Sequence, residues 1–465
     1  MKRLILWQSK DRLFYSSQKG GTPVDYDVIV IGGGLAGLTA ALELSEKGKR
    51  TLVIEKRDHI GGRCSSWDEN GMTVESGLHK HFSFFTNMKD ILSRVGVNIE
   101  DHFMWQKDME VLLPDNKGTA LFGTAPLQAP HIFLKGVAGN KNQLTSKDKR
   151  SIISFIFSAM KDYFFNKQEL DRISVHSYAR KLKVTDRAYA YLIVPSTTGV
   201  FYMSPEEYSM KVYLDIIMPA LTKKVGFYTA PMGEIIANPL ADGVKLRGGE
   251  IRLSTSVDNL IYEDGVMKGV RVKGGGTLTA SNIILATSIT PAQCLLKKHL
   301  GDHEWFSSML KMPASSAVSV QLELTKPALS DDFIKFGPQT TLPVFAEQSR
   351  TAFKHLPGRL SVVLDQAEKM LRLNDEEIYN SVIADAKKLG MNLNPIVTDY
   401  RVLRHENERY HIGAGHQWMR PEQKTPVKGL TLAGEYTKQP YHTTTEGAVI
   451  SGKKAAEVIL KESQA

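Results

Sequence analysis

The hydrophobic pattern near the N-terminus predicts a strand, a helix and a second strand in succession. Val28 to Ile31 is a continuous apolar run, as in a strand that is buried on both faces of a parallel sheet. Apolar side chains then recur at helical spacing, at Leu35, Leu38 and Leu42. Thr51 to Ile54 supplies the next apolar strand. This order is that of one unit of a doubly wound α/β fold.

Three glycines join the first predicted strand to the helix as GxGxxG. Gly32 permits the tight turn, Gly34 lets the backbone approach a pyrophosphate, and Gly37 lets the helix pack closely against the strand. The first amides of the helix, at Leu35 and Ala36, then face the phosphate groups. The turn is therefore a candidate dinucleotide site.

An acidic residue completes this pattern. Glu55 ends the second strand eighteen residues after Gly37, where it would accept hydrogen bonds from ribose hydroxyls. A lone GxGxxG is weak evidence, but the strand, the helix and the acid together make chance unlikely. Gly274 to Gly276 lacks that context, because a strand follows it rather than a helix. We interpret it as the end of a hairpin, and we expect no separate NAD(P) domain.

Composition places the chain among globular proteins. Its 465 residues are 42% hydrophobic and 23% charged, and this length suggests about two or three domains. The net charge of +9 favours anionic partners, but no nucleic-acid-binding motif is found, so we expect no nucleic acid partner. Cys64 and Cys294 are the only cysteines, which disfavours a disulfide scaffold and a dithiol flavin reductase. We expect no metal site.

The ends and apolar runs of the chain bear on its location. Residues 1–24 begin with Lys2 and Arg3, but the apolar run from Leu4 to Trp7 is too short for a signal-peptide core. We interpret these residues as a loose leader. No run of about eighteen apolar residues occurs, so a transmembrane helix is not predicted. We expect a cytoplasmic protein.

One stretch combines positive charge with apolar residues. Between His131 and Lys167, seven lysines and arginines stand against Asp148 and Asp162. Apolar residues from Ser151 to Ala159 and aromatic residues from Tyr163 to Phe165 lie beside them, as in an interfacial helix. A core helix with a solvated basic flank gives the same pattern, so both interpretations stand. The first predicts peripheral attachment to an anionic membrane.

The residues after the ribose acid resemble those of a known family. Lys56 to Arg63 reads KRDHIGGR, and a Gly-Gly-Arg at this place is similar to the flavoprotein family that includes amine oxidases and carotenoid desaturases. The resemblance implies FAD as the cofactor. It brings the backbone of Gly61 and Gly62 near FAD, adds Lys56 to the site and gives Arg63 the role of a fixed cation for the pyrophosphate. A solvated surface arginine is the alternative for Arg63.

A second segment resembles the part of the desaturases that runs beside the flavin ring. Thr73 to Asn87 reads TVESGLHKHFSFFTN, and the likeness places Gly77, Leu78 and His79 at the flavin. His79 is our candidate catalytic residue, near the reacting carbon. A histidine that only packs and hydrogen-bonds is the more frequent case.

The C-terminal region closely resembles the closing motif of phytoene and zeta-carotene desaturases of the plant and cyanobacterial type. Leu430 to Ile459 reads LTLAGEYTKQPYHTTTEGAVISGKKAAEVI. The likeness implies a strand, then contacts from Gly434 and Glu435 to the ribityl and phosphate region, then a helix. The first amides of that helix would point at the pyrimidine edge of the flavin and stabilise its anionic reduced form. These amides belong to Gly447, Ala448 and Val449.

Two departures from the family pattern bear on the substrate. Amine oxidases commonly place a tyrosine two residues before the glutamate that Glu446 matches, as part of an aromatic cage for the amine, whereas this chain has Thr444. The missing cage residue favours an isoprenoid over an amine. Glu435 is a milder departure, because the desaturases usually carry aspartate there.

Together these patterns predict an α/β protein with a Rossmann-like, GxGxxG dinucleotide-binding FAD domain and an inserted α+β substrate domain. The resemblance places the backbone of Val257 against the adenine and Ala286 at the end of a returning strand beside FAD. The predicted segments are residues 25–99, 226–290 and 426–465 for the FAD domain, and 100–225 and 291–425 for the substrate domain.

The resemblance implies an FAD-dependent oxidoreductase, with desaturation of a long isoprenoid as the leading activity. The partners that follow are an apolar small-molecule substrate and a quinone or oxygen as electron acceptor, because no NAD(P) domain is expected. The alternatives are hydroxysqualene dehydroxylation, amine oxidation and a non-catalytic flavin-binding membrane scaffold. The oligomeric state is left open.

Overall fold

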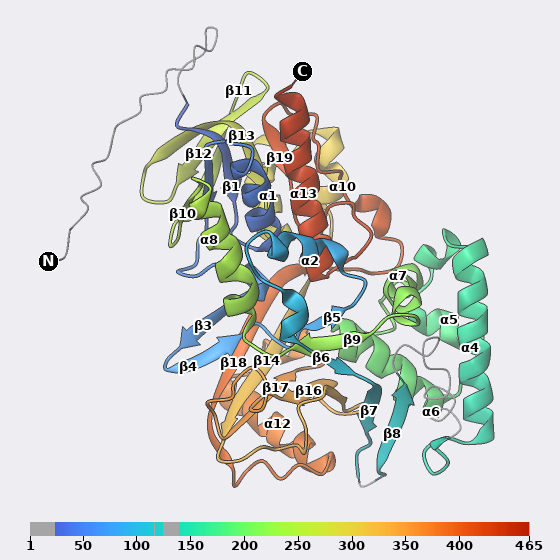
Figure 1. The fold of residues 1–465 in the computed structure, drawn as a ribbon. Helices are drawn as coiled ribbons and strands as arrows, with labels where there is room; N and C mark the ends of the chain where they lie inside the picture. The colour runs from blue at the N-terminus through green and yellow to red at the C-terminus, as the bar shows by residue number, and fades with distance from the viewer. Residues whose placement is uncertain (1–23, 116, 124–138, 465) are drawn as a thin grey trace, which may run out of the picture.

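The structure is a computed structural model that describes residues 24–115, 117–123 and 139–464 (Figure 1). Residues 1–23 of the predicted leader, and the part of the basic stretch up to residue 138, lie outside the described residues. No helix in the described residues is long and apolar enough to cross a membrane.

A seven-stranded sheet carries the nucleotide motif. Its order is β10 (Glu250–Arg252), β2 (Thr51–Ile54), β1 (Tyr26–Ile31), β13 (Thr277–Leu285), β12 (Val266–Val272) and β11 (Val257–Glu263), and β19 (Leu430–Leu432) also pairs with β13. β1 pairs in parallel with both β2 and β13, so the chain crosses over through α1 (Leu35–Ser45). Every residue of β2 is buried, as the apolar run predicts.

Helices cover this sheet and join distant segments. In Figure 1, α1 lies between α8 (Asn238–Leu246) and α13 (Thr445–Glu462), and all three pack together through α1. α2 (Thr86–Ser93) packs against α13, and α9 (Ile289–Leu300) packs against β11. The predicted glycine hairpin at residues 274–276 is confirmed, because β12 and β13 pair in antiparallel across it. The division into domains stays a prediction, although all strands of this sheet come from the segments expected to bind FAD.

A second seven-stranded sheet lies beneath the first in Figure 1. Its order is β18 (Val397–Tyr410), β14 (Ala314–Leu324), β17 (Gly358–Val363), β16 (Val344–Glu347), β15 (Lys335–Phe336), β7 (Asp108–Leu112) and β8 (Thr119–Gly123). α11 (Ala367–Met370) and α12 (Asp375–Lys388) pack against it and share its hydrophobic core. β18 is fourteen residues long, and its C-terminal end reaches back toward the nucleotide sheet.

Smaller elements connect the two sheets. A three-stranded sheet has the order β5 (Lys80–Phe82), β9 (Val225–Tyr228), β6 (Phe103–Gln106), and β3 (Ser66–Glu69) pairs with β4 (Met72–Glu75). The helices α4 (Ser146–Phe165), α5 (Val175–Lys181), α6 (Asp186–Ala188) and α7 (Met210–Ala220) form a layer at one side of the molecule. Two π-helical turns, Tyr189–Ile193 and Pro195–Gly199, lead from this layer toward β5.

Candidate functional site

A cavity of about 620 Å³ opens at the carboxyl ends of the parallel strands β1, β2, β13 and β19. This edge is where open α/β sheets bind their ligands. Sixteen of the twenty residues predicted to contact FAD line the cavity. They are Gly32, Gly34, Leu35, Ala36, Glu55, Lys56, Gly61, Gly62, Arg63, Leu78, His79, Val257, Ala286, Gly434, Glu435 and Ala448.

The other four predicted residues, Gly37, Gly77, Gly447 and Val449, do not line it. A Cβ on Gly37 would lie 2.0 Å from the carbonyl oxygen of Gly32, so Gly37 acts through close packing of helix on turn, as predicted. The amide of Gly447 donates to the hydroxyl of the helix cap Thr444. The prediction that this amide points at the flavin was therefore wrong, because a side-chain cap uses it within the helix.

The neighbouring amides of α13 correct the same prediction. The amide of Ala448 donates to the Thr444 carbonyl, and Val449 is fully buried. The start of α13 nevertheless reaches the cavity, because Thr443, Thr444 and Thr445 all line it. The positive end of the helix dipole therefore faces the space where the resemblance places the pyrimidine edge.

Two glycine turns meet where the pyrophosphate is expected. Gly32 has a φ of +109°, and a Cβ there would lie 2.8 Å from the carbonyl oxygen of Ala286. At Gly34 no atom lies within 4 Å of an added Cβ, so its backbone borders open space. The amide of Gly61 donates to the carbonyl of Gly33 at 2.8 Å, which fixes the second turn against the first. Backbone can thus approach a phosphate from both sides.

Glu55 lies between these turns with both carboxylate oxygens oriented by backbone. One oxygen accepts from the amide of Gly33 at 2.7 Å, and the other accepts from the amide of Arg57 at 2.9 Å. A carboxylate has about four acceptor positions, so two remain for ribose hydroxyls. This geometry agrees with the role predicted for Glu55.

Arg63 is partly exposed and pairs with an acid in the loop that follows β19. Its guanidinium lies 3.0 Å from Oε1 of Glu435, and the same oxygen accepts from the amide of Tyr410 at 2.9 Å. The acid that departs from the family's usual aspartate therefore holds both Arg63 and β18. The surface alternative for Arg63 is not supported, because the residue lines the cavity and is paired with a buried acid.

The end of β18 supplies three cavity residues that the sequence did not reveal, namely His405, Glu408 and Arg409. Burial alone would raise the pKa of Glu408, but a hydrogen bond from His405 and the nearby cations Arg57 and Arg63 hold that pKa at about 2. Glu408 also pairs with Arg57 at 2.8 Å. No motif marks this strand, and only its antiparallel pairing with β14 brings it to the site.

Several polar atoms in the cavity wall lack a partner among the described residues. They are Oε2 of Glu435, Nη1 of Arg409, Nε2 of His405 and Oγ1 of Thr445. Buried polar atoms are normally hydrogen-bonded, so these atoms point to a polar ligand. The hydroxyls of a ribityl chain and the oxygens of a pyrophosphate offer the missing partners. The glycine turns, Glu55 and these atoms together fit FAD.

His79 lies in the cavity but is poorly suited to act as a base. Its Nε2 is 3.3 Å from the hydroxyl of Ser76. Burial and the nearby cations Arg63 and Lys80 lower the pKa of His79 to about 3, so the imidazole is neutral near pH 7. An imidazole with so low a pKa holds a proton only weakly. The packing and hydrogen-bonding role is the better supported one.

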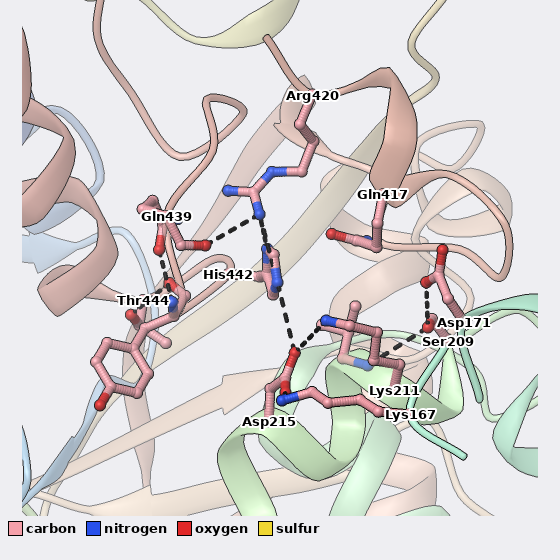
Figure 2. A network of polar contacts seen from close by, with 12 residues as sticks. Lys167, Asp171, Ser209, Lys211, Asp215, Gln417, Arg420, Gln439, His442 and Thr444 are labelled. Carbon is pink, nitrogen blue, oxygen red and sulfur yellow. Dashed lines mark hydrogen bonds and ion pairs between the residues drawn. The ribbon is translucent and has the colours of Figure 1, made fainter. Parts of the chain in front are cut away.

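A buried polar network holds the loop that precedes α13 (Figure 2). The guanidinium of Arg420 contacts Nδ1 of His442 and donates to the carbonyl of Gln439 at 3.1 Å. Figure 2 shows the ring of His442 between Arg420 and Asp215, whose carboxylate lies 3.9 Å from Nε2. Burial and the neighbouring cations lower the pKa of His442 well below its ordinary value, so the ring is neutral.

Asp215 connects this loop to the helical layer. It lies on α7 and pairs with Lys167 at 2.8 Å and Lys211 at 2.6 Å. Because the ring of His442 is neutral and 3.9 Å is beyond hydrogen-bond distance, the loop before α13 contacts Asp215 on α7 by packing of His442 (Figure 2). The network joins the start of α13 to the layer of α4 to α7.

Comparison with known proteins identifies one family and several related desaturases. Residues 35–460 match the family described as flavin containing amine oxidoreductase. The chain is 26% identical to a 15-cis-phytoene desaturase of Capsicum annuum, over 97% of this chain and 80% of the relative. It is 26% identical to a 15-cis-phytoene desaturase and to a probable zeta-carotene desaturase of Synechococcus elongatus, over 93% and 94% of this chain and 95% and 99% of those relatives.

Solved structures share the fold. A putrescine oxidase bound to putrescine aligns with a TM-score of 0.72 at 16% identity, covering 94% of this chain and 99% of that one. An oxidoreductase of Methanosarcina mazei aligns with a TM-score of 0.70 at 17% identity, covering 92% and 99%.

Proposed function

The chain belongs to the flavin containing amine oxidoreductase family and is an FAD-dependent, carotenoid-desaturase-like oxidoreductase, and on this premise we propose that it desaturates a long isoprenoid such as phytoene. When bound, FAD supplies the acceptor for a hydride. The chain's own residues have the remaining tasks, which are to hold an apolar molecule against the flavin, to exclude water and to receive a proton.

A second cavity carries this proposal. It measures about 200 Å³ and adjoins the first, with which it shares Lys80, Phe82 and Val200. Its wall is almost entirely aliphatic and aromatic, and comes from α4, α7 and the strands β5, β7 and β8. Such a space favours a hydrocarbon over a polar substrate. It holds only part of a long isoprenoid, so the rest of the chain extends beyond it.

Two observations disfavour an amine as the substrate. The cap residue Thr444 stands where an aromatic cage residue would be, and no carboxylate lines the second cavity in the described part of the chain to pair with an ammonium group. Hydroxysqualene dehydroxylation uses an equally apolar substrate and is the second candidate.

We propose a quinone or oxygen as the electron acceptor. The support is that the other run of three glycines in the sequence, at residues 274–276, is the tip of a hairpin between β12 and β13. It leaves no second nucleotide turn of the type at Gly32 among the described residues. A quinone and oxygen are acceptors that bind without a nucleotide domain.

Product analysis tests the proposed function. The purified FAD-loaded protein is incubated with phytoene in liposomes and a soluble quinone, and the extract is separated by chromatography. We expect a product that has lost two hydrogens per turnover and absorbs at longer wavelength. Parallel incubations with hydroxysqualene and simple amines separate the alternatives. Turnover of an amine but not of phytoene would overturn the proposal, and FAD that no substrate reduces would favour the scaffold.

We further propose that α4 lies on an anionic membrane surface from which the substrate enters. Ile152, Phe155 and Ala159 on its inner side line the second cavity. On its outer side Phe157 and Phe164 are 69% and 68% exposed. Large exposed apolar side chains beside lysines are typical of an interfacial helix, because a solvated face would be polar.

Vesicle flotation tests the attachment. Phe157→Glu is expected to release the protein from phosphatidylglycerol vesicles at low salt, because it places a negative charge among the contacting side chains. Leu246→Glu on α8 is the matched control, since Leu246 is 86% exposed on a different surface. Equal flotation of both variants, or no flotation of the wild type, would remove this proposal.

A further inference from the structure

Lys80 lies where the two cavities meet. It is the first residue of β5, and its side chain lines both the cofactor cavity and the apolar cavity. Lysines are rarely placed in such surroundings without a paired acid. A substrate that enters from the apolar cavity must pass this amino group to reach the flavin.

The contacts of Lys80 hold its amino group in place but supply no negative charge that would stabilise its protonated form. Nζ donates to the carbonyl of Gly199 at 3.0 Å and lies 5.4 Å and 5.9 Å from the ring centroids of Tyr202 and Phe336. No carboxylate pairs with Lys80 in the described residues. An unpaired cation in these surroundings is costly, so the neutral amine is favoured.

The local backbone is shaped to hold this contact. Gly199 ends the π-helical turn Pro195–Gly199, a type of turn that is frequent at functional sites. A Cβ on Gly199 would lie 2.4 Å from the ring of Phe336, so only glycine lets that ring pack there. The following residue, Val200, lines both cavities. The carbonyl that accepts from Lys80 therefore has a fixed place.

We propose that Lys80 is the base that removes the proton during desaturation, an inference that rests on the proposed function. One C–H bond of the substrate breaks with its electron pair, which passes to FAD as a hydride. The C–H bond on the adjacent carbon breaks the other way: its proton goes to the neutral amine of Lys80, and its electron pair forms the new double bond. The substrate loses two electrons, FAD gains them, and lysine becomes ammonium.

Among the titratable groups that face Lys80, none other changes protonation near neutral pH. Burial lowers the pKa of Lys80 to about 7 and that of the adjacent His79 to about 3. Burial raises the pKa of Tyr202 well above its ordinary value and that of Tyr213 to about 12. Arg409, whose guanidinium lies 5.4 Å from the Tyr202 ring centroid, stays charged. Burial also raises the pKa of Glu75, which lines neither cavity, to about 7, so an inflection near 7 belongs to Lys80 only if Lys80→Met abolishes it.

Anaerobic flavin reduction by phytoene across pH tests the proposal. For the wild type the rate constant is expected to fall about tenfold per pH unit below about 7, because the amine becomes protonated. Lys80→Met, which keeps the length but removes the base, should slow reduction about 100-fold and abolish this inflection. Lys80→Arg should be equally slow, because a guanidinium does not release its proton. Lys223→Met, at an exposed lysine that lines neither cavity, should match the wild type.

Two further measurements separate a base from a structural residue. Competitive labelling of lysines with acetic anhydride, read by mass spectrometry, should show that Lys80 titrates near neutral pH. Small primary amines should partly restore flavin reduction in Lys80→Ala.

The outcomes are distinguishable. If the flavin of Lys80→Met is reduced at the wild-type rate, or if the labelling of Lys80 shows no titration near neutral pH, the proposal that Lys80 is the base is wrong. The proposed function is unaffected by either result. If phytoene does not reduce the wild-type flavin, the proposed function falls and the base with it.

Discussion

The two adjoining cavities are built by opposite means. The cofactor cavity is formed by glycine turns, oriented carboxylates and paired cations, and its wall comes from segments that are hundreds of residues apart. The apolar cavity is formed by ordinary core side chains of α4, α7 and β7, with a single charged residue at its edge. Binding a nucleotide requires backbone and polar groups at defined positions, whereas binding a hydrocarbon requires only an apolar space that excludes water. The cofactor is therefore recognised by the positions of particular groups, and the substrate by the shape of the cavity.

Glycine variants should show the strongest contrast. Gly37→Ala places a Cβ 2.0 Å from the Gly32 carbonyl oxygen, and we expect it to cost about 3 kcal/mol or more of unfolding free energy and to abolish FAD binding. Gly34→Ala adds a Cβ into open space, so the apoprotein should keep its stability while FAD affinity falls about tenfold or more. Thermal unfolding and FAD titration measure the two effects. Equal behaviour of the two variants would contradict the cavity geometry.

Filling the apolar cavity should impair reaction with the substrate but leave FAD binding unchanged. Ala159→Phe, on the inner side of α4, should leave FAD binding unchanged but slow flavin reduction by phytoene about tenfold or more, at a cost of about 1–3 kcal/mol in stability. Ile153→Phe adds bulk on the exposed side of the same helix and serves as the control. Anaerobic absorbance traces give the rate of flavin reduction in each of the two variants. Loss of FAD in the Ala159 variant would show that the cavities are not separate in function.

The connection between the two regions can be weakened at Asp215. Asp215→Asn leaves Lys167 and Lys211 without their acid, and we expect a loss of about 1–2 kcal/mol, discounted because both lysines are partly solvated. FAD should also dissociate faster, since a shift of α7 at this position would reach the loop before α13 through the packing of His442. Asp242→Asn removes an exposed lysine partner on α8 and is the control. Unchanged FAD release in the Asp215 variant would show that the loop is held by other contacts.

One variant is expected to gain stability rather than lose it. Folded Lys80 has a pKa of about 7, whereas an unfolded lysine titrates near about 10.4, so between these values the unfolded state binds more protons and stability rises with pH. Lys80→Met removes this dependence. It should be more stable than the wild type at pH 6, by on the order of a few kcal/mol and at most the ~4.6 kcal/mol that the pKa difference corresponds to, with the difference shrinking as pH approaches about 10. Chemical denaturation of both proteins at pH 6 and at about pH 10 measures the sign of this stability difference.

The same contrast explains what the sequence could predict. Gly32, Gly34, Glu55 and the Gly-Gly-Arg turn are constrained by the cofactor, so their spacing survives as a readable pattern. The sequence could not indicate Glu408 or Arg409, because their place depends on the pairing of β18 with β14 across about eighty residues. Such non-local pairing leaves no local signal.

Two errors have physical causes as well. The amides of Gly447 and Ala448 were expected at the flavin, but the Thr444 cap takes up the first helical amides, and a threonine before the helix is the signal for that cap. His79 was the candidate catalytic residue because of its place in the desaturase-like segment, and no pattern singled out Lys80. Burial lowers the pKa of His79 to about 3 and that of Lys80 to about 7, and such shifts depend on surroundings that a sequence does not show.

The most direct test of the central claim is the absorbance of the FAD-loaded protein after anaerobic addition of phytoene in liposomes. The claim is that a hydrocarbon in the apolar cavity reduces the flavin in the adjoining one. We expect the oxidised flavin band to disappear in the wild type and to persist in Ala159→Phe over the same interval. A band that phytoene leaves unchanged in the wild type, while a simple amine bleaches it, would contradict the account.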